Sequence, residues 1–544
     1  MLNKKTYLYF LVVSRLREMC SAAAAALALL ALASAQSVTY YISPTGSDGA
    51  SGRSPAAAWR SAARASALQL QPGDAVLFEA AAAAHELGDV GLLVRGAGPL
   101  RVGVYGALPR ATLHVDASAT FGVRVLDVAG GVEVSNLTLL HTGSGKAQNN
   151  GVEAVSSSTS AAASRLAGGV RLHDLEAAGF LNGVSFSAAS CGGFDGVEVS
   201  RVTASGSLAA GISSYGALGP GSSPACYSHA NVLVQHCTAR DNAGDASNSA
   251  GHSGSGIVLA GVDGGRIAWC TAHGNGARNG HQGGGPVGIW WWGARNAVIE
   301  HSLSFNNSNG HAGTSSEDGG GFDLDGGCTG CVIQYCLSFG NAGPGYLVCS
   351  YGGLAPTRNN TVRFSVSLND GARSGNGAAG VNFYTPDALS GLLVQGNTLV
   401  SAAPRLPLLG PTPYGAPASG VSLLGNALLA LAGAPLLSAP LQQLPAPPLA
   451  VRGNAYWGGS AGAFQAAWGG ATYASLAALR AGTGLEEGAG GAPTGSDADP
   501  GLALSAWFEA CVPPPPLGSA LPLLPNSPAL DALRGFSGCP AGRG

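Results

Sequence analysis

Four carboxylates stand close together near the middle of the chain, in the segment SSEDGGGFDLDGG at 315–327. They belong to Glu317, Asp318, Asp323 and Asp325. A pair of such groups can act as general acid and general base at a glycosidic bond, and a larger set can supply oxygen ligands to Ca²⁺. All four are therefore candidate catalytic residues, and Asp318, Asp323 and Asp325 are candidate Ca²⁺ ligands. A solvated acidic loop is the alternative.

Two tryptophans, Trp290 and Trp292, stand about one repeat before the aspartates, in the segment GIWWW at 288–292. Flat aromatic faces beside hydrogen-bonding carboxylates suit the binding of sugar rings. If Asp323 and Asp325 share one strand, their Cα atoms lie about 6.6 Å apart. This distance is closer to the carboxyl spacing of inverting glycosidases than to that of retaining ones. A loop that folds over the tryptophans and makes them a secondary core is the alternative.

Two further residues near this segment have side chains suited to catalysis. His301 suits proton transfer near neutral pH, although a structural corner role is the alternative. Arg295 is a candidate base for a lyase that uses Ca²⁺ to neutralise a uronate, and Arg278 and Lys146 are other candidates for that base.

The elements that position these residues are short strands that recur along the chain. Segments such as VSNLTLL at 134, IAWCTAH at 267 and IQYCLSF at 333 repeat at intervals of 38, 27, 35, 33, 32, 34, 29 and 32 residues. Each unit then restarts with a glycine and an apolar strand, and asparagine recurs between the two kinds of strand. Fixed-period repetition of short strands with Asn and Gly at the corners is typical of a β-solenoid. A β-propeller is disfavoured because about 32 residues is short for a four-stranded blade.

Strand alternation predicts which side chains point outward. The residue after the glycine is apolar in every unit, so it faces the interior, and the second and fourth positions face outward. The second positions are Glu153, Ser185, Ser213, Val258, Trp290, Asp323, Leu347 and Asn382. The fourth positions are Val155, Ser187, Tyr215, Ala260, Trp292, Asp325, Cys349 and Tyr384. Asn382 and Tyr384 therefore join Trp290 and Trp292 as candidate substrate-binding residues.

The corner pattern I-x-x-[NCS]-x-[AILSTV] resembles the parallel β-helix repeat of the pectate-lyase-like superfamily. The entry segment YYISPTGSDG at 40 and the closing segments GNAYW at 453 and NSPALDA at 526 are also similar to those of such secreted proteins. The resemblance implies an all-β, right-handed single-stranded parallel β-helix with a short capping helix. It covers about residues 38–535 and is weak for the reaction, because this fold hosts lyases, hydrolases, epimerases and non-catalytic proteins.

The organisation expected from these features has four parts. Residues 1–35 form a signal peptide, 36–110 an entry cap, 111–430 the β-helix repeats, and 431–544 the last rungs and a Pro/Ala-rich closing segment. The basic leader, its Ala/Leu run and the motif Ala33-Ser34-Ala35 predict secretion, with an organellar transit peptide as the alternative. Asn136, Asn306 and Asn359 are candidate glycosylation sites.

The cysteines suit an oxidising compartment. Cys191 with Cys226 and Cys511 with Cys539 are the simplest loop-closing pairs. Cys237 and Cys270 occupy equivalent slots and form either stacked thiols or a disulfide. A zinc site made of Cys328, Cys331, Cys336 and Cys349 is less favoured than disulfides.

Composition narrows the function further. With 85 Gly, 31 Pro and 10% charged residues the chain is not a helical enzyme, and a net charge of -3 gives no nucleic-acid footprint. No stretch is apolar and long enough to predict a membrane span. We expect a secreted monomer that binds a polysaccharide and cleaves it as a lyase or a glycoside hydrolase. A uronate-containing polymer is a candidate substrate. A non-catalytic cell-wall or matrix protein that binds carbohydrate, or a scaffold protein, is the alternative, and Ca²⁺ is the only cofactor expected.

Overall fold

The computed structural model describes residues 37–498 except for 144–146, 282–283, 311–317, 352, 355, 372–376, 403–405, 432 and 461. The predicted signal peptide, Lys146, Glu317 and the pair Cys511 and Cys539 lie outside the described residues. No helix in the described ranges is long and apolar enough to cross a membrane.

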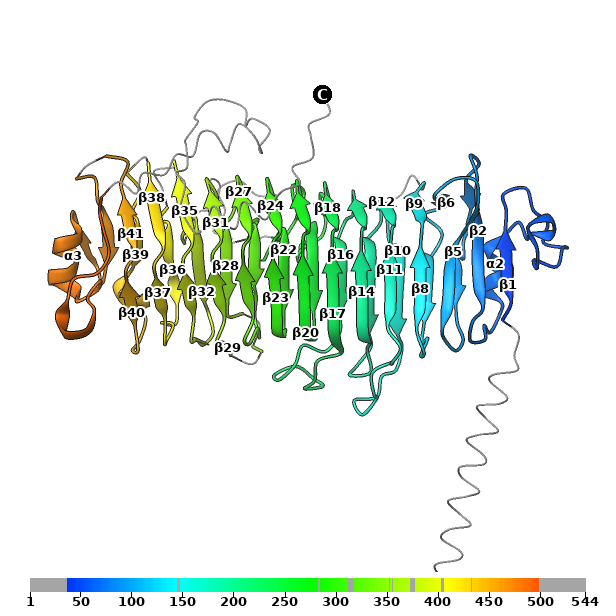
Figure 1. Ribbon diagram of the computed structural model, residues 1–544, viewed down its shortest axis with the longest axis horizontal. Helices are drawn as coiled ribbons and strands as arrows, with labels where there is room; N and C mark the ends of the chain where they lie inside the picture. The colour runs from blue at the N-terminus through cyan, green and yellow to red at the C-terminus, as the bar shows by residue number, and fades with distance from the viewer. Residues whose placement is uncertain are drawn as a thin grey trace, which may run out of the picture.

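The chain winds as a coil in which every turn contributes one strand to each of three long sheets, and Figure 1 shows the strands stacked along the longest axis of the molecule. Neighbouring strands within each sheet run parallel, apart from the last pair, β42 and β43. The sheets contain 14, 13 and 14 strands, so the solenoid has about 13 turns. The predicted all-β parallel β-helix is confirmed.

The three sheets are named here in the order in which the chain visits them. Sheet 1 consists of β1 (Thr39–Ile42), β2 (Ala75–Ala80), β5 (Leu100–Gly106), β8 (Val132–Ser135), β11 (Val170–His173), β14 (Asp195–Ser200), β17 (His229–Gln235), β20 (Val262–Ala268), β23 (Arg295–Glu300), β26 (Val332–Gln334), β30 (Thr361–Arg363), β34 (Leu393–Gln395), β37 (Ser422–Leu424) and β40 (Ala450–Arg452). Sheet 2 consists of β3 (His85–Glu86), β6 (Ala111–Val115), β9 (Leu137–His141), β12 (Glu176–Ala178), β15 (Thr203–Ser205), β18 (Thr238–Arg240), β21 (Thr271–His273), β24 (Leu303–Phe305), β27 (Leu337–Phe339), β31 (Val366–Leu368), β35 (Thr398–Ser401), β38 (Ala427–Ala430) and β41 (Ala455–Trp457). Sheet 3 consists of β4 (Leu92–Val94), β7 (Phe121–Leu126), β10 (Asn150–Ser156), β13 (Asn182–Ala188), β16 (Ala210–Tyr215), β19 (Ser255–Ala260), β22 (Ile289–Trp292), β25 (Phe322–Leu324), β28 (Tyr346–Cys349), β32 (Val381–Thr385), β36 (Leu409–Gly415), β39 (Leu437–Ala439), β42 (Ala466–Trp468) and β43 (Ala471–Tyr473).

Short elements complete the structure. β29 (Thr357–Arg358) and β33 (Leu389–Ser390) form a separate parallel pair. At the two ends of the coil lie α2 (Ala62–Ser66), which packs beside β4, and α3 (Leu476–Thr483). Single turns of 3-10 helix lie at Pro55–Ala57, Leu441–Gln443 and Ala489–Gly491. The segment 403–450, whose Pro/Leu/Ala-rich composition suggests an irregular return, instead continues the coil through β36 to β40.

The corner between sheets 1 and 2 is made by one residue in the left-handed backbone region. In five successive coils this residue is aromatic: His236, Trp269, His301, Tyr335 and Phe364 have φ values of 54°, 56°, 49°, 54° and 51°. The next residue points inward and forms a buried stack, as the repeat predicted. In that stack the amide of Cys270 donates to Ser302 Oγ over 3.2 Å, and the amide of Cys336 donates to Ser365 Oγ over 3.1 Å.

The corner between sheets 2 and 3 holds a ladder of buried asparagines. Asn242, Asn275, Asn307 and Asn341 each donate their side-chain amide to the carboxamide or carboxylate oxygen of the next coil, over 2.8 to 2.9 Å. The ladder ends on Asp370, and all five side chains are buried. These bonds satisfy polar groups that the crowded corner would otherwise leave unpaired inside the protein.

Candidate functional site

The candidate site lies on the outer face of sheet 3, in β22, β25 and β28. The strand register places Trp290 opposite Asp323, and Asp323 opposite Leu347. The next pair of strands places Leu347 opposite Asn382. Trp291, which alternation assigns to the interior, is fully buried in the main core. The structure therefore brings the predicted second-position residues together in one column.

That column is covered. Trp290 is 3% exposed and Asp323 is 2% exposed. Trp290 packs with Ala210, Val258 and Val287 in a small cluster outside the main core, and its Nε1 donates to Ser255 Oγ over 3.3 Å. The imidazole of His252 meets the indole edge to face at 5.1 Å. The first part of the aromatic face is thus a secondary core, the alternative that the sequence left open.

The fourth-position column is more accessible. Trp292, Asp325 and Tyr384 are each half-buried, and Cys349 between them is buried. The register places Cys349 opposite Tyr384. A ligand that approaches the outer face of sheet 3 would therefore meet Trp292, Asp325 and Tyr384 before it met Trp290 or Asp323.

Asp323 is a buried carboxyl whose environment disfavours its charge. Burial raises its pKa well above the usual range, and the nearby charges of Asp325 and Asp318 raise it further. Its Oδ1 has no hydrogen-bond partner among the described residues. An ionised carboxylate here would be unpaired and poorly solvated, so the surroundings favour the protonated form of Asp323.

Asp325 titrates closer to neutrality. Burial raises its pKa to about 6, although the amide of Gly326 and the thiol of Cys349 hydrogen-bond to the carboxylate and oppose the rise. The Gly326 amide donates to Oδ1 over 2.7 Å. A half-buried carboxyl with such a pKa can hold a proton in mildly acidic solution and donate it to a substrate.

Asp318 joins the same group of carboxyls from the segment between β24 and β25. It is half-buried, and its Oδ2 accepts the amide of Gly285 over 2.7 Å. This bond ties together two neighbouring segments that lead from sheet 2 to sheet 3. The influence of Asp318 on the pKa values of Asp323 and Cys349 places all three in one electrostatic neighbourhood.

The described residues do not form a preorganised metal site. Within the described ranges no group of three or more His, Cys, Asp or Glu side chains converges as ligands would. Asp318, Asp323 and Asp325 are close enough to influence one another, but their oxygens do not meet at one point. We derive no chemical step through Ca²⁺, which stays a sequence-based prediction.

Two predicted catalytic residues lie on other faces of the coil. Arg295 begins β23 in sheet 1, where its Nε donates to Asp263 over 2.9 Å and its guanidinium lies over Tyr227 at 5.1 Å. His301 lies at the corner between sheets 1 and 2, stacked between Trp269 at 4.4 Å and Tyr335 at 5.2 Å. The structure does not bring either residue into the Asp323 and Asp325 group.

Sequence reasoning gave His252 no role, and it considered Cys349 only as a zinc ligand or a disulfide partner. Burial lowers the pKa of His252 to about 4, with a smaller contribution from His281, so its imidazole is neutral at neutral pH. Burial likewise raises the pKa of the Cys349 thiol, which stays protonated beside Asp325. The position of Cys349 in the fourth-position column could have predicted that it lies beside Asp325. His252 lies in a segment with no repeat pattern, so its position could not be predicted in this way.

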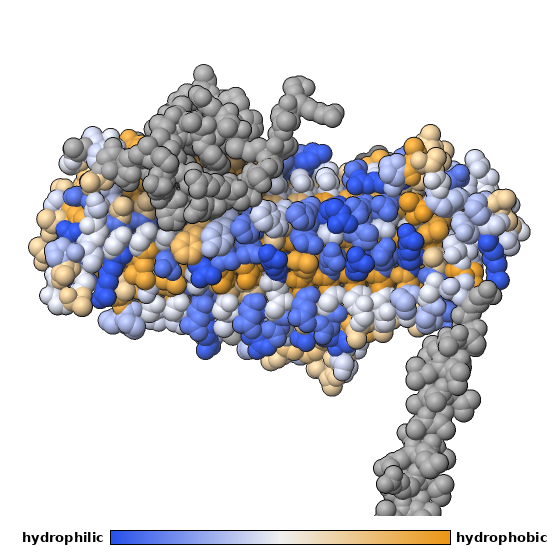
Figure 2. Space-filling model, viewed as in Figure 1, coloured by the Kyte–Doolittle hydropathy of each residue, from blue (hydrophilic) through white to orange (hydrophobic). Residues whose placement is uncertain are grey.

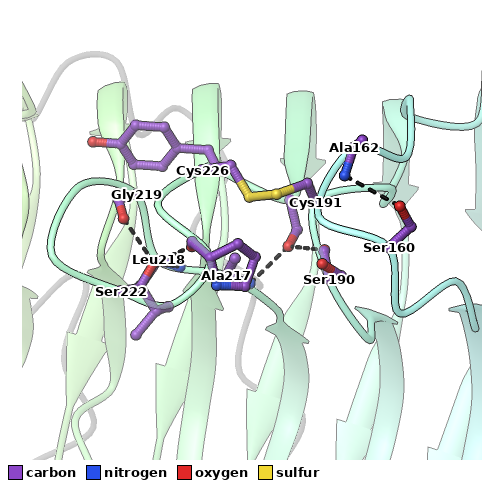
Figure 3. The surroundings of a disulfide bond; sticks show 12 residues. Ser160, Ala162, Ser190, Cys191, Ala217, Leu218, Gly219, Ser222 and Cys226 are labelled. Carbon is purple, nitrogen blue, oxygen red and sulfur yellow. Dashed lines mark hydrogen bonds between the residues drawn. A yellow bond between two sulfur atoms is a disulfide. The ribbon is translucent and has the colours of Figure 1, made fainter.

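The disulfide between Cys191 and Cys226 is confirmed, with Cα atoms 5.8 Å apart. Figure 3 shows it joining two neighbouring loops that lead from sheet 3 to sheet 1, beside a small network centred on Ser222. The disulfides preferred for Cys328, Cys331, Cys336 and Cys349 are wrong, because all four are buried free thiols, and Cys237 and Cys270 are stacked thiols. Cys237, Cys270, Cys328, Cys331 and Cys336 lie in the main core, where a small apolar side chain fits the stack.

The three predicted glycosylation sites differ in exposure. Asn306 and Asn359 are exposed, and both occupy left-handed turn positions. Asn136 is half-buried at a corner of the same kind. Glycosylation stays a prediction at all three.

Comparisons with known proteins bear on the fold. The sequence matches no protein-family model and no curated protein. Among solved structures, the chain is similar to a GH136 lacto-N-biosidase from Eubacterium ramulus, with 17% identity, a TM-score of 0.44 and coverage of 67% of this chain. The match spans 64% of that enzyme, slightly less than two thirds of its length.

Two lyases are also similar in structure. Pectate lyase Pel9A matches with 17% identity and a TM-score of 0.34, over 66% of this chain and 77% of that one. A rhamnogalacturonan lyase matches with 11% identity and a TM-score of 0.29, over 85% of this chain and 87% of that one.

Proposed function

We propose that this protein binds a polysaccharide along the outer face of sheet 3 and cleaves a glycosidic bond there. The observation that carries the proposal is the half-buried carboxyl of Asp325, whose burial raises its pKa to about 6. It lies beside Trp292 and close to Asp323, whose pKa burial also raises. Carboxyl groups with separated pKa values next to an aromatic side chain are the components that glycosidic cleavage uses.

In this proposal Asp325 is the general acid. Its proton passes to the glycosidic oxygen as the bond between that oxygen and the anomeric carbon breaks. Asp318 is the candidate for the base that activates water, because it is the other half-buried carboxyl in the group. Trp292 and Tyr384 contribute the faces against which sugar rings would pack. Asp323 lies behind them and is buried.

The decisive experiment compares the wild type with Asp325→Asn on a panel of neutral and uronate-containing polysaccharides. We expect new reducing ends with the wild type and a loss of at least about a hundredfold in the variant, the scale of a lost general acid. Activity should fall as pH rises through about 6, because only protonated Asp325 can donate. Ultraviolet-absorbing unsaturated products would indicate a lyase instead of a hydrolase.

A non-catalytic carbohydrate-binding protein is the second candidate, and the burial of Trp290 and Asp323 favours it. The two candidates separate in one comparison. Binding without products in the wild type, unchanged by Asp325→Asn and weakened by Trp292→Ala, would refute cleavage and support binding alone. Binding unchanged by both Trp292→Ala and Tyr384→Ala would refute the proposed face.

A further inference from the structure

The outer face of sheet 2 changes character along the coil. In β12, β15 and β18 it carries polar side chains such as Glu176, Thr203 and Arg240. From β24 to β41 its two outward columns become apolar, and the register aligns Leu303, Leu337 and Val366 in one column and Phe305, Phe339, Leu368, Val400, Leu429 and Trp457 in the other. We call these nine residues the apolar face.

The apolar face is separate from the interior of the coil. Six of its members form a distinct cluster together with half-buried neighbours, and none of the six belongs to the main core. Phe305 and Phe339 stack at 4.6 Å on this outer side. A continuous outward apolar surface of this extent on a protein in water requires a partner.

The six clustered side chains are nevertheless buried. Val366 and Leu368 are each 1% exposed, Val400 is 2% exposed and Leu337 is 5% exposed. The substantial contacts that the described strands β24 to β41 make with other described elements are with strands of sheet 2. Neighbours within one flat sheet cannot bury an outward side chain to this degree, so another segment must lie on it.

The described chain ends beside this face. Ser496 pairs with Ala455 at the start of β41, where the amide of Tyr456 donates to the Ser496 carbonyl over 2.7 Å. Residue 498 is therefore next to the last strand of sheet 2, the strand that carries Trp457. The remaining 46 residues, 499–544, start at this edge.

We propose that the C-terminal segment 499–544 of this same chain docks on the apolar face. It has five charged residues in 46, and its apolar side chains include Trp507, Phe508, Leu517, Leu521, Leu523, Leu524, Leu530, Leu533 and Phe536. Reach is not limiting. The face runs over six rungs, whose five spacings add up to about 24 Å, whereas 46 extended residues span up to about 150 Å. Prolines at 513–516, 522, 525 and 528 suit an extended segment that packs by its side chains without joining the sheet.

A photo-crosslinking experiment on the full chain tests the proposal. Phe339 is replaced by p-benzoylphenylalanine, and the matched control carries the same group at Thr203 on the polar part of sheet 2. We expect crosslinks from position 339 to peptides of 499–544 within a single chain, and none to that segment from position 203. Crosslinks from position 339 to a second copy of the chain, or the absence of any to 499–544, would overturn the proposal.

A second experiment does not depend on the crosslinker. A site for a specific protease is inserted after Ala498 in the full chain, and the cleaved protein is passed over a size-exclusion column. In the cleaved wild type we expect the segment to elute together with the β-helix. In the cleaved Val400→Glu variant the amount of segment that elutes with the β-helix should be at least about tenfold lower, because docking would bury an unpaired charge. Thr203→Glu is the control and should retain it fully. Release of the segment from the cleaved wild type would contradict docking.

Discussion

Asp370 ends the asparagine ladder and offers the sharpest test of how the coil is stabilised. Ser304 with Asn307 and Ser338 with Asn341 repeat one arrangement, in which the asparagine Nδ2 donates to the serine three residues earlier over 3.0 and 2.9 Å. In the next coil Ser367 and Asp370 take these places, and Ser367 Oγ donates to Asp370 Oδ2 over 2.7 Å. Asp370→Asn should therefore extend the ladder without a change of shape.

The magnitude follows from the pKa of Asp370. Burial raises it from 3.8 to about 6, although hydrogen bonds from Ser367 and Asn341 oppose the rise. A carboxyl with a raised pKa in the folded state contributes stability that is fully present below about pH 3.8 and is lost as pH rises through about 6. For this shift the loss is about 3 kcal/mol at neutral pH. The asparagine variant carries no such charge, so it should escape this loss.

A local measurement is needed, because a long solenoid need not unfold in a single two-state transition. Hydrogen exchange of peptides that cover 361–371 reports on the rung that holds Asp370. We expect equal rates in the wild type and Asp370→Asn near pH 4, and exchange about a hundredfold slower in the variant at pH 7. The exposed Asp89→Asn serves as control and should exchange like the wild type in this region. A ratio that does not change between pH 4 and pH 7 would refute the reasoning.

Three further predictions concern the coil and its loops. Trp291→Ala removes a fully buried indole and should lower the free energy of unfolding by about 3–5 kcal/mol. Trp292→Ala should lower it less, because Trp292 is half-buried, and chemical denaturation of both variants measures the difference. Cys191→Ser opens a disulfide that closes a loop of 35 residues and should cost about 4 kcal/mol under non-reducing conditions, and an unchanged thermal midpoint would argue against this estimate. Asn307→Ala leaves ladder groups unpaired and should cost about 1–3 kcal/mol, whereas Asn306→Gly, at the exposed neighbouring turn position, should cost less than about 1 kcal/mol in the same titration.

The alternation of the site strands could be predicted because a solenoid is built from local periodicity. Each strand pairs with the equivalent strand about one repeat away, so the register that aligns Trp290 with Asp323 follows from the repeat itself. The buried slots of Cys270 and Ser302 and the asparagine corners follow in the same way. The repeat does not predict which neighbours the side chains contact. Arg295 pairs with Asp263, and His301 stacks on Trp269.

The sequence alone determined the coil, its repeat and the inward or outward direction of the strand residues, because these depend on spacing along the chain. Only the tertiary structure decided which outward residues meet solvent. The segments between sheets 2 and 3 have no fixed period, and two of their residues, His252 and Val287, pack on Trp290, while Trp292 and Asp325 stay half-exposed. Burial sets the pKa of a carboxyl, so the difference between Asp323 and Asp325 was decided by contacts between segments that no repeat encodes.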